Sequence, residues 1–206
     1  MTDNTHRSYD NSGADSWALE TRSIHAGQPV DSDTGSRNLP IYLTSSFLFN
    51  SAEHARQRFA LEDLGPVYSR LTNPTVEAVE QRIASLEGGV HAVLFASGQA
   101  AETAAILNVA RAGSHIVSSP RLYGGTETLF AVTLARLGIE TTFVDNPDDP
   151  ESWAAAVKPN TVAFYGETIP NPKGDIFDIE KIAQAAHSVG VPLIVDNTVA
   201  TPYLTR

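Results

Sequence analysis

From residue 74 onward, short apolar runs alternate with longer segments whose apolar residues fall at helical spacing. The spacing is clearest in one segment, where apolar side chains recur every three or four positions: Val76, Val79, Ile83 and Leu86. Strands and helices that alternate in this way bury their apolar faces as a mainly parallel sheet with helices on both sides. The predicted fold class is therefore α/β.

The same pattern predicts the individual elements. We expect strands at 92–96, 115–118, 141–144, 162–165 and 193–195, and helices at 76–86, 99–111, 126–137, 151–157 and 179–189. The stretch from Trp17 to Gly65 shows no such alternation, and its prolines and glycines interrupt regular structure. That part is predicted to be an arm and loop region with a short β-prone stretch at 41–49.

The composition excludes several classes of protein. The chain has 206 residues and a net charge of −10, and an acidic chain repels nucleic-acid backbones. It has no cysteine, which excludes a disulfide framework and thiolate metal sites. Residues 1–15 are polar and lack the apolar core of a secretion signal, and no apolar run approaches the roughly 18 residues of a membrane-spanning helix. We expect a loose tail at 1–15, no membrane association and a cytoplasmic location.

Polar residues follow several of the expected strands, at the edge where parallel sheets bind ligands. The stretches concerned are Ser97-Gly98-Gln99, residues 123–126, residues 167–171 and Asp196-Asn197-Thr198. Because the carboxyl ends of parallel strands meet at one edge, we expect these residues to form a single site.

Gly98 and Gln99 lie where a strand passes into a helix. Glycine lets a backbone approach a ligand closely, and free N–H groups at a helix start attract an anion such as phosphate. An ordinary tight turn explains the same residues, and this alternative stays open. The G-x-G-x-x-G and G-x-x-x-x-G-K-[ST] fingerprints are missing, which disfavours a nicotinamide or nucleoside-triphosphate site. Ser97 does not lie in G-x-S-x-G, so a hydrolase nucleophile has little support.

Asp196 ends an apolar strand, where its carboxylate can hold a cationic ring nitrogen and keep it protonated. A helix cap or a metal ligand is the commoner role for such an aspartate, but no paired histidines or carboxylates accompany it, and no metal site is predicted. Tyr68 and Arg70 precede the first expected helix. Arginine binds phosphate bidentately and tyrosine adds a hydroxyl donor, although a solvated loop accounts for the same pair.

Seven stretches together resemble the Cys/Met-metabolism family of pyridoxal 5'-phosphate (PLP) enzymes. They are T-R-S-I-H-A-G-Q at 21–28, Y-S-R-L-T-N-P-T at 68–75, L-E-G-G at 86–89, A-S-G-Q-A-A at 96–101, L-Y-G-G-T at 122–126, E-T-I-P-N-P at 167–172 and V-D-N-T-V-A-T-P-Y-L at 195–204. They run in family order along nearly the whole chain. The resemblance implies the large domain of PLP fold type I, which is aspartate-aminotransferase-like, with a tail and arm at 1–65 and the N-terminal part of the PLP-binding domain at 66–206.

The resemblance also implies cofactor contacts. Gly98 and Gln99 are expected to donate backbone N–H groups to the PLP phosphate. Tyr68 and Arg70 are expected to reach the phosphate in a neighbouring subunit, which implies a homodimer and commonly a homotetramer of two such pairs.

The remaining implied contacts surround the cofactor ring. Tyr123 is expected to stack on the ring and to assist proton or leaving-group chemistry. Asp196 is expected to pair with the ring nitrogen, and Asn171 to lie near the ring oxygen O3'. Thr198 and Glu167 are further polar candidates nearby.

Within the family, the chain is most similar to the O-acetylhomoserine sulfhydrylase branch, on H-A-G-Q at 25–28, on Gln99 and on G-E-T-I-P-N-P-K-G at 166–174. That resemblance implies replacement of the acetate of O-acetyl-L-homoserine by sulfide to give L-homocysteine, in methionine biosynthesis. Leu43 departs from the glutamine often found there. Cystathionine γ-synthase activity, methionine γ-lyase activity and a non-catalytic ligand-binding role remain alternatives.

The family's Schiff-base lysine lies in a Ser-x-Thr-Lys-like motif beyond the Asp-Asn-Thr segment. The lysines of this chain are Lys158, Lys173 and Lys181, and none lies in such a motif. We therefore expect a fragment of a full enzyme, inactive alone, without the rest of the large domain and the small C-terminal domain. A separate polypeptide that supplies the lysine is the alternative.

Overall fold

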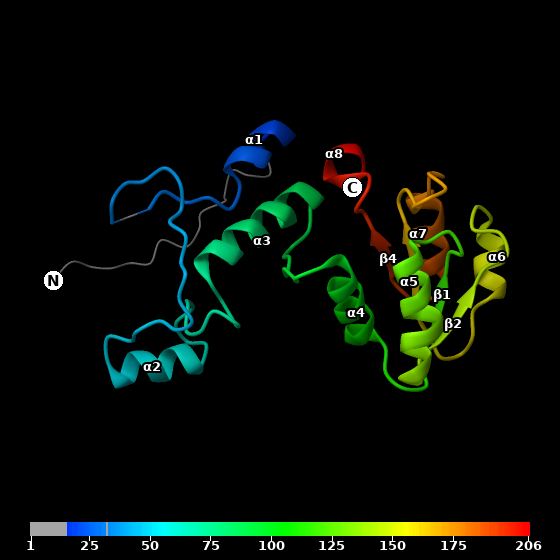
Figure 1. Ribbon diagram of the computed structural model, residues 1–206, viewed down its shortest axis with the longest axis horizontal. Helices are drawn as coiled ribbons and strands as arrows, with labels where there is room; N and C mark the ends of the chain where they lie inside the picture. Colours follow the sequence, from blue (N-terminus) through cyan, green and yellow to red (C-terminus); the bar gives the residue numbers. More distant parts are fainter. Residues whose placement is uncertain (1–15, 32) are drawn as a thin grey trace. The chain divides into compact units, whose positions relative to one another are not determined.

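The computed structural model describes residues 16–31 and 33–206. The expected tail at 1–15 lies outside these residues. Contacts divide the chain into two compact units, unit 1 (Met1–Leu94) and unit 2 (Phe95–Arg206), coloured blue to green and green to red in Figure 1. The division between an arm and a cofactor-binding part at residue 65 remains a prediction.

Unit 1 contains the helices α1 (Leu19–His25), α2 (Ala52–Phe59) and α3 (Pro74–Glu87). The helix expected at 76–86 is α3. It begins where the Asn73 side chain accepts a hydrogen bond from the Thr75 N–H, and it ends at Gly88, whose φ is 69°. The helices α1 and α2 lie in the stretch that the sequence pattern left irregular, and the only β feature described there is a single bridge between Ser46 and Tyr68.

Unit 2 is built on a sheet of four parallel strands: β1 (His115–Ser118), β2 (Glu140–Phe143), β3 (Thr161–Glu167) and β4 (Leu193–Asp196). Their order across the sheet is β2-β1-β3-β4. The pairing of β3 with β4 sets Glu167 opposite Asp196 at the last position of both strands. The side chains of Glu167 and Asp196 therefore start from neighbouring positions at the carboxyl edge of the sheet.

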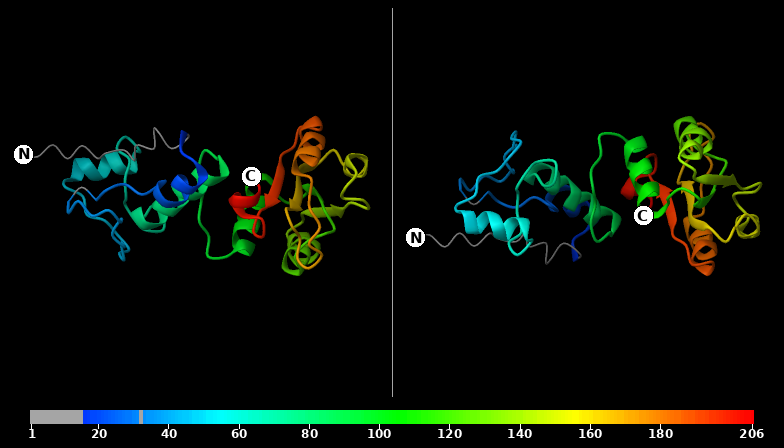
Figure 2. Two further views of the ribbon diagram at one scale, coloured as in Figure 1. Left: turned by 90° about the horizontal axis from the view of Figure 1, so that it is seen from above. Right: turned by 90° about the horizontal axis from the view of Figure 1, so that it is seen from below.

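Helices cover both faces of this sheet, as the α/β prediction requires. The helices of unit 2 are α4 (Gly98–Val109), α5 (Gly124–Thr128), its π-helical continuation η2 (Leu129–Leu134), α6 (Pro150–Ala155), α7 (Ile179–Ser188) and the short α8 (Thr201–Leu204). Of these, α4 and η2 contribute to the core on one face of the sheet, and α6 and α7 to the core on the other. Figure 2 shows α5 and α7 on opposite sides of the sheet.

Alternate residues of the central strands feed two separate cores. On one face, Tyr165 packs edge-on against Phe130 of η2 with ring centroids 4.6 Å apart. On the other face, Phe164 packs against Trp153 of α6 at 5.2 Å, within a cluster that includes Ile182 of α7. Burial on both faces fixes the strand register, because a slip by one residue would exchange the two sets of side chains.

The prediction of a strand at 92–96 is wrong. No strand forms there, and Val93 and Phe95 are 64% and 46% exposed. A strand requires a neighbour that completes its backbone hydrogen bonds, and the described residues provide none for this segment. The Leu94 N–H donates instead to the Glu80 side chain at 2.8 Å. The sequence thus identified the apolar segment, but it did not show that the segment has no partner strand.

Within residues 16–31 and 33–206, no helix is long and apolar enough to cross a membrane.

Gly27, which lies just beyond α1, packs closely against α3, and this contact yields a stability prediction. Gly27 has φ of 69°, and a Cβ built there would lie 2.3 Å from the Ala78 carbonyl oxygen of α3. Gly35 has a similar φ of 71° but no atom within 4 Å of such a Cβ. Gly27→Ala should therefore lower the free energy of unfolding by about 1–3 kcal/mol more than Gly35→Ala does. Urea unfolding of both variants measures the difference, and equal losses would contradict the packing.

Candidate functional site

A pocket of about 350 Å³ lies at the carboxyl edge of the sheet in unit 2, a size suited to a small organic ligand. Residues from α4, from the start of α5 and from the ends of β3 and β4 line it: Ser97, Gly98, Gln99, Glu102, Tyr123, Glu167, Ile169, Asn171, Asp196, Thr198 and Val199. Seven residues singled out from the sequence are thereby brought together: Gly98, Gln99, Tyr123, Glu167, Asn171, Asp196 and Thr198.

The N-terminus of α4 provides the anion-binding end of this pocket. Ser97 caps the helix by accepting a hydrogen bond from the Ala100 N–H at 3.2 Å. In the described part of the chain, the backbone N–H groups of Gly98 and Gln99 have no acceptor. A Cβ built at Gly98 would meet no atom within 4 Å. Two free donors at an open helix start form a site for a phosphate or carboxylate.

Asp196 contributes a carboxylate, which attracts a cation, to the same pocket. Its Oδ1 accepts hydrogen bonds from the Thr198 N–H at 2.8 Å and from the Thr198 hydroxyl at 2.5 Å. Both bonds use the same oxygen, so Oδ2 stays available to a ligand. A carboxylate oriented in this way at the end of β4 suits a cationic N–H group.

Glu167 holds the turn that carries Tyr123. Its Oε1 accepts a hydrogen bond from the Tyr123 N–H at 2.8 Å, and burial raises the pKa of the Glu167 carboxyl. The Tyr123 ring lies over Gly125, where a Cβ would fall 2.5 Å from Cε1 of the ring. Tyr123 itself is 49% exposed, so its face and hydroxyl remain accessible.

Glu102 is a pocket residue that the sequence analysis missed. Its carboxyl accepts hydrogen bonds from Gln99 Nε2 at 2.8 Å and from the Thr126 hydroxyl at 3.1 Å. Burial, followed by the charges of Asp196 and Glu167, raises the pKa of Glu102 to about 7. The available signal was that Glu102 is the one charged residue of α4 and lies about one turn beyond Gln99.

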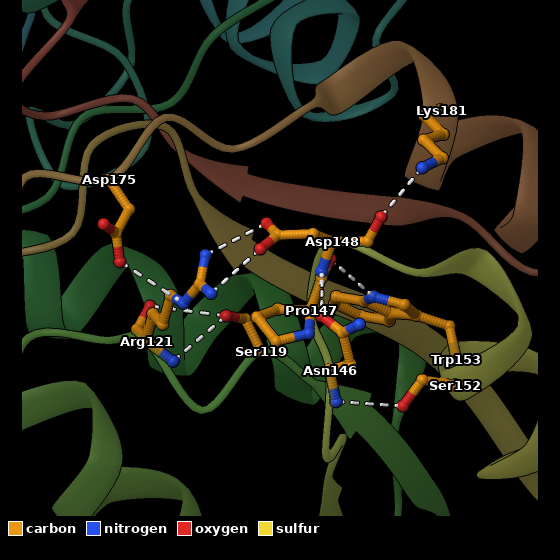
Figure 3. A network of polar contacts seen from close by, with 9 residues as sticks. All are labelled: Ser119, Arg121, Asn146, Pro147, Asp148, Ser152, Trp153, Asp175 and Lys181. Atoms are coloured by element: carbon orange, nitrogen blue, oxygen red, sulfur yellow. Dashed lines mark hydrogen bonds and ion pairs between the residues drawn. The ribbon is translucent and has the colours of Figure 1, made fainter.

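A polar network anchors the loops around the pocket (Figure 3). Arg121, two residues before Tyr123, pairs with both carboxylate oxygens of Asp148 at 3.0 and 2.9 Å and approaches Asp175 at 3.3 Å. Lys181 of α7 donates to the Asp148 carbonyl oxygen at 2.8 Å. Bidentate arginine–carboxylate pairs fix orientation as well as distance. This network therefore joins the turn before Tyr123 to the loop that follows Asn171.

The charged side chains that line the pocket are all acidic. Glu102, Glu167 and Asp196 contribute carboxyl groups, whereas no lysine or arginine occurs among the lining residues. The free N–H groups of α4 attract an anion, and the carboxyl groups attract a cation. The pocket therefore suits a ligand that carries both a negative group and a protonated nitrogen.

Tyr68 and Arg70 belong to unit 1. The Arg70 guanidinium lies 5.2 Å from the centre of the Tyr68 ring, so the two side chains form a cation–π pair. Their expected contact with phosphate remains a prediction.

The raised pKa of Glu102 yields a pH-dependent prediction. Between its ordinary pKa of 4.5 and the folded value of about 7, the folded state retains a proton that the unfolded chain has lost. The free energy of unfolding therefore falls as pH rises through this range. Glu102→Gln removes the titration, so the variant should gain stability relative to wild type between pH about 5 and about 8.

Urea unfolding at the two pH values measures this relative gain. Glu127→Gln, at an exposed position of α5, is the control and should show no comparable change. A constant difference between Glu102→Gln and wild type would contradict the burial of the Glu102 carboxyl.

Known proteins resemble the chain along most of its length. It is 72% identical over 198 residues to an O-acetyl-L-homoserine sulfhydrylase of Corynebacterium glutamicum, covering 96% of this chain and 45% of that protein. It is 49% identical over 180 residues to a homocysteine synthase of Schizosaccharomyces pombe, covering 87% of this chain and 42% of that protein. The chain thus spans less than half the length of these relatives.

A solved structure shows the same fold. It is the crystal structure of a putative O-acetylhomoserine (thiol)-lyase of Campylobacter jejuni with a pyridoxyl-lysine monophosphate group. It superposes with a TM-score of 0.86 at 40% identity, covering 91% of this chain and 46% of that one. The family profile described as "Cys/Met metabolism PLP-dependent enzyme" matches residues 20–206. The chain therefore belongs to the Cys/Met metabolism family of PLP-dependent enzymes.

Proposed function

We propose that this chain forms the N-terminal part of a PLP-dependent enzyme that replaces the acetate of O-acetyl-L-homoserine with sulfide and gives L-homocysteine. The observation that carries the proposal is the pocket with free N–H groups at Gly98 and Gln99 and a carboxylate at Asp196. The 72% identity to a C. glutamicum O-acetyl-L-homoserine sulfhydrylase supports this particular reaction.

The residues present fit PLP. The α4 N-terminus suits its phosphate, and Asp196, held by Thr198, suits its ring nitrogen. Tyr123 and Asn171 line the same pocket and suit the ring face and the ring oxygen. When bound, PLP acts as an electron sink that stabilises negative charge on the substrate. In this proposal Asp196 would keep a proton on the ring nitrogen, and the Tyr123 hydroxyl, which belongs to the same pocket, would transfer a proton to the leaving group.

The Schiff-base lysine is proposed to come from outside these residues, which leaves the fragment inactive by itself. Lys158 pairs with Glu140 at 2.6 Å, and Lys181 donates to the Asp148 carbonyl oxygen at 2.8 Å. Lys173 is exposed in the loop beyond Asn171. None of the three lines the pocket. A following segment of a full enzyme is the proposed source, and a separate polypeptide is the alternative.

We also propose that the active form is a cytoplasmic homo-oligomer, commonly a tetramer of two dimers, in which Tyr68 and Arg70 of one copy reach the phosphate bound by another. Because no lysine or arginine among residues 16–31 and 33–206 lines the pocket, a cation supplied by a second copy would complete the phosphate site. Exposed apolar side chains in unit 1, including Leu43 at 95% and Leu48 at 98%, support burial against a second copy.

Asp196→Ala in the intact enzyme should lower turnover at least about 100-fold, because loss of a charge that acts on the cofactor removes several kcal/mol of stabilisation. Homocysteine formation from O-acetyl-L-homoserine and sulfide measures it. Asp145→Ala removes an exposed aspartate just beyond β2 and serves as the control. Near-normal turnover of Asp196→Ala would overturn the cofactor assignment.

Shared active sites predict recovery of activity in mixed oligomers. Arg70→Ala and Asp196→Ala should each be inactive, but a hybrid pair keeps one site with both native residues. Half of randomly reassembled pairs are hybrids, and half of their sites are intact, so equal mixing should restore about a quarter of wild-type activity. The assay follows homocysteine after the two variants are dissociated and reassociated together. Absence of recovery would mean that Arg70 serves its own chain or plays no part.

A further inference from the structure

We propose that Glu102 is a positioning residue for Asp196: its protonated carboxyl donates a hydrogen bond to Asp196 and thereby holds that carboxylate toward the cofactor nitrogen. The inference rests on the proposed function, because it concerns the partner of the ring nitrogen. It adds a residue of α4 to a contact that otherwise involves only β4 and the turn at Thr198.

The hydrogen bonds of Glu102 leave one of its oxygens to carry a proton. Oε2 accepts from Gln99 Nε2 at 2.8 Å and from the Thr126 hydroxyl at 3.1 Å. The alternative contact of that hydroxyl with Oε1 is longer, at 3.2 Å. The Thr126 hydroxyl has a single proton and bonds only one of the two oxygens at a time, whereas Gln99 bonds Oε2 alone. When Thr126 donates to Oε2, Oε1 is left to carry the carboxyl proton.

Asp196 has an oxygen that can accept this hydrogen bond. Both bonds from Thr198 end on Oδ1. Oδ2 has two lone pairs, which suffice for the Glu102 hydroxyl and for a ring N–H together. Glu102 and Asp196 line the same pocket, and both the charge of Asp196 and a hydrogen bond with it are among the causes that raise the pKa of Glu102.

Burial and the neighbouring carboxyl groups favour the protonated form of Glu102, and they outweigh the Thr126 hydrogen bond, which lowers its pKa. Asp196 on β4 and Glu167 on β3 add negative charge, and they combine with burial to raise the pKa of Glu102 to about 7. Tyr165 on β3 is 1% exposed, and its hydroxyl lies toward Glu102 but forms no hydrogen bond of normal geometry. Burial raises the pKa of Tyr165, so it stays a neutral donor. Thr126 of α5, which is fully buried, adds no charge.

Two substitutions separate a hydrogen-bond donor from a space-filling side chain. Glu102→Gln keeps the shape and an N–H donor but cannot ionise, so it reproduces the protonated carboxyl. Glu102→Met keeps the length but has no donor. Both are made in the intact enzyme, and both are compared with wild type and with Asp196→Ala.

The first measurement is the dissociation constant of PLP at neutral pH, obtained by titrating the cofactor-free protein. Glu102→Gln should bind like wild type, whereas Glu102→Met should bind about tenfold more weakly, as expected for the loss of one hydrogen bond to a charged group. The second measurement is the ring-nitrogen NMR shift of bound ¹⁵N-labelled PLP. The nitrogen should stay protonated in Glu102→Gln and lose protonation in Glu102→Met.

Wild-type binding and ring protonation in Glu102→Met would overturn the role of Glu102 while leaving the proposed function intact. Equal losses in Glu102→Gln and Glu102→Met would also overturn it, because the glutamine retains a donor. Failure of wild type to bind PLP, or unchanged binding by Asp196→Ala, would instead overturn the proposed function and this inference together.

Discussion

The parallel pairing of β3 with β4 is the constraint on which the candidate site depends. It brings Glu167 and Asp196 to the same level at the carboxyl edge of the sheet, and each carboxyl then has a separate task. Glu167 receives the Tyr123 N–H, while Asp196 is oriented by Thr198. The register is fixed by the two cores, in which Tyr165 and Phe164 pack on opposite faces. Core packing thus determines the spacing of the functional groups.

The electrical polarity of the pocket follows from this arrangement. Free N–H groups at the start of α4 and the carboxyl groups of Glu102, Glu167 and Asp196 line the same pocket. Such a pocket favours ligands that carry both an anionic and a cationic group. The concentration of carboxyls has a cost, because like charges at short distance disfavour ionisation. Protonation of Glu102 relieves that repulsion and adds a donor where Asp196 has a free oxygen.

Part of the site was predictable because the ends of parallel strands converge: Asp196 ends the apolar strand β4, and Thr198 follows it. Gly98 also follows an apolar run, but that run forms no strand, so the strand pattern does not explain its position in the pocket. Glu102 was not predictable in this way, because its role depends on which side of α4 faces β4. Resemblance to the PLP enzyme family added the chemical identity of the ligand, which the residue pattern alone left open.

The success of the helix and strand predictions likewise depended on whether local sequence or tertiary contacts determine each element. Strand β1 coincides with its prediction, and α4 and α7 differ from theirs by one or two residues, because their apolar patterns are long or sharply bounded. The helix α2 was missed, since it depends on a local cap in which Ser51 accepts the His54 N–H at 3.0 Å. The run at 92–96 has the apolar character of a strand, but pairing is a property of the neighbours and not of the run.

A crystal structure of the intact enzyme with PLP would locate the cofactor relative to α4 and β4. We expect phosphate oxygens within hydrogen-bond distance of the Gly98 and Gln99 N–H groups, and the ring nitrogen about 2.8 Å from an oxygen of Asp196. A cofactor bound with its phosphate away from the start of α4, or with its ring nitrogen facing any group other than Asp196, would contradict this expectation.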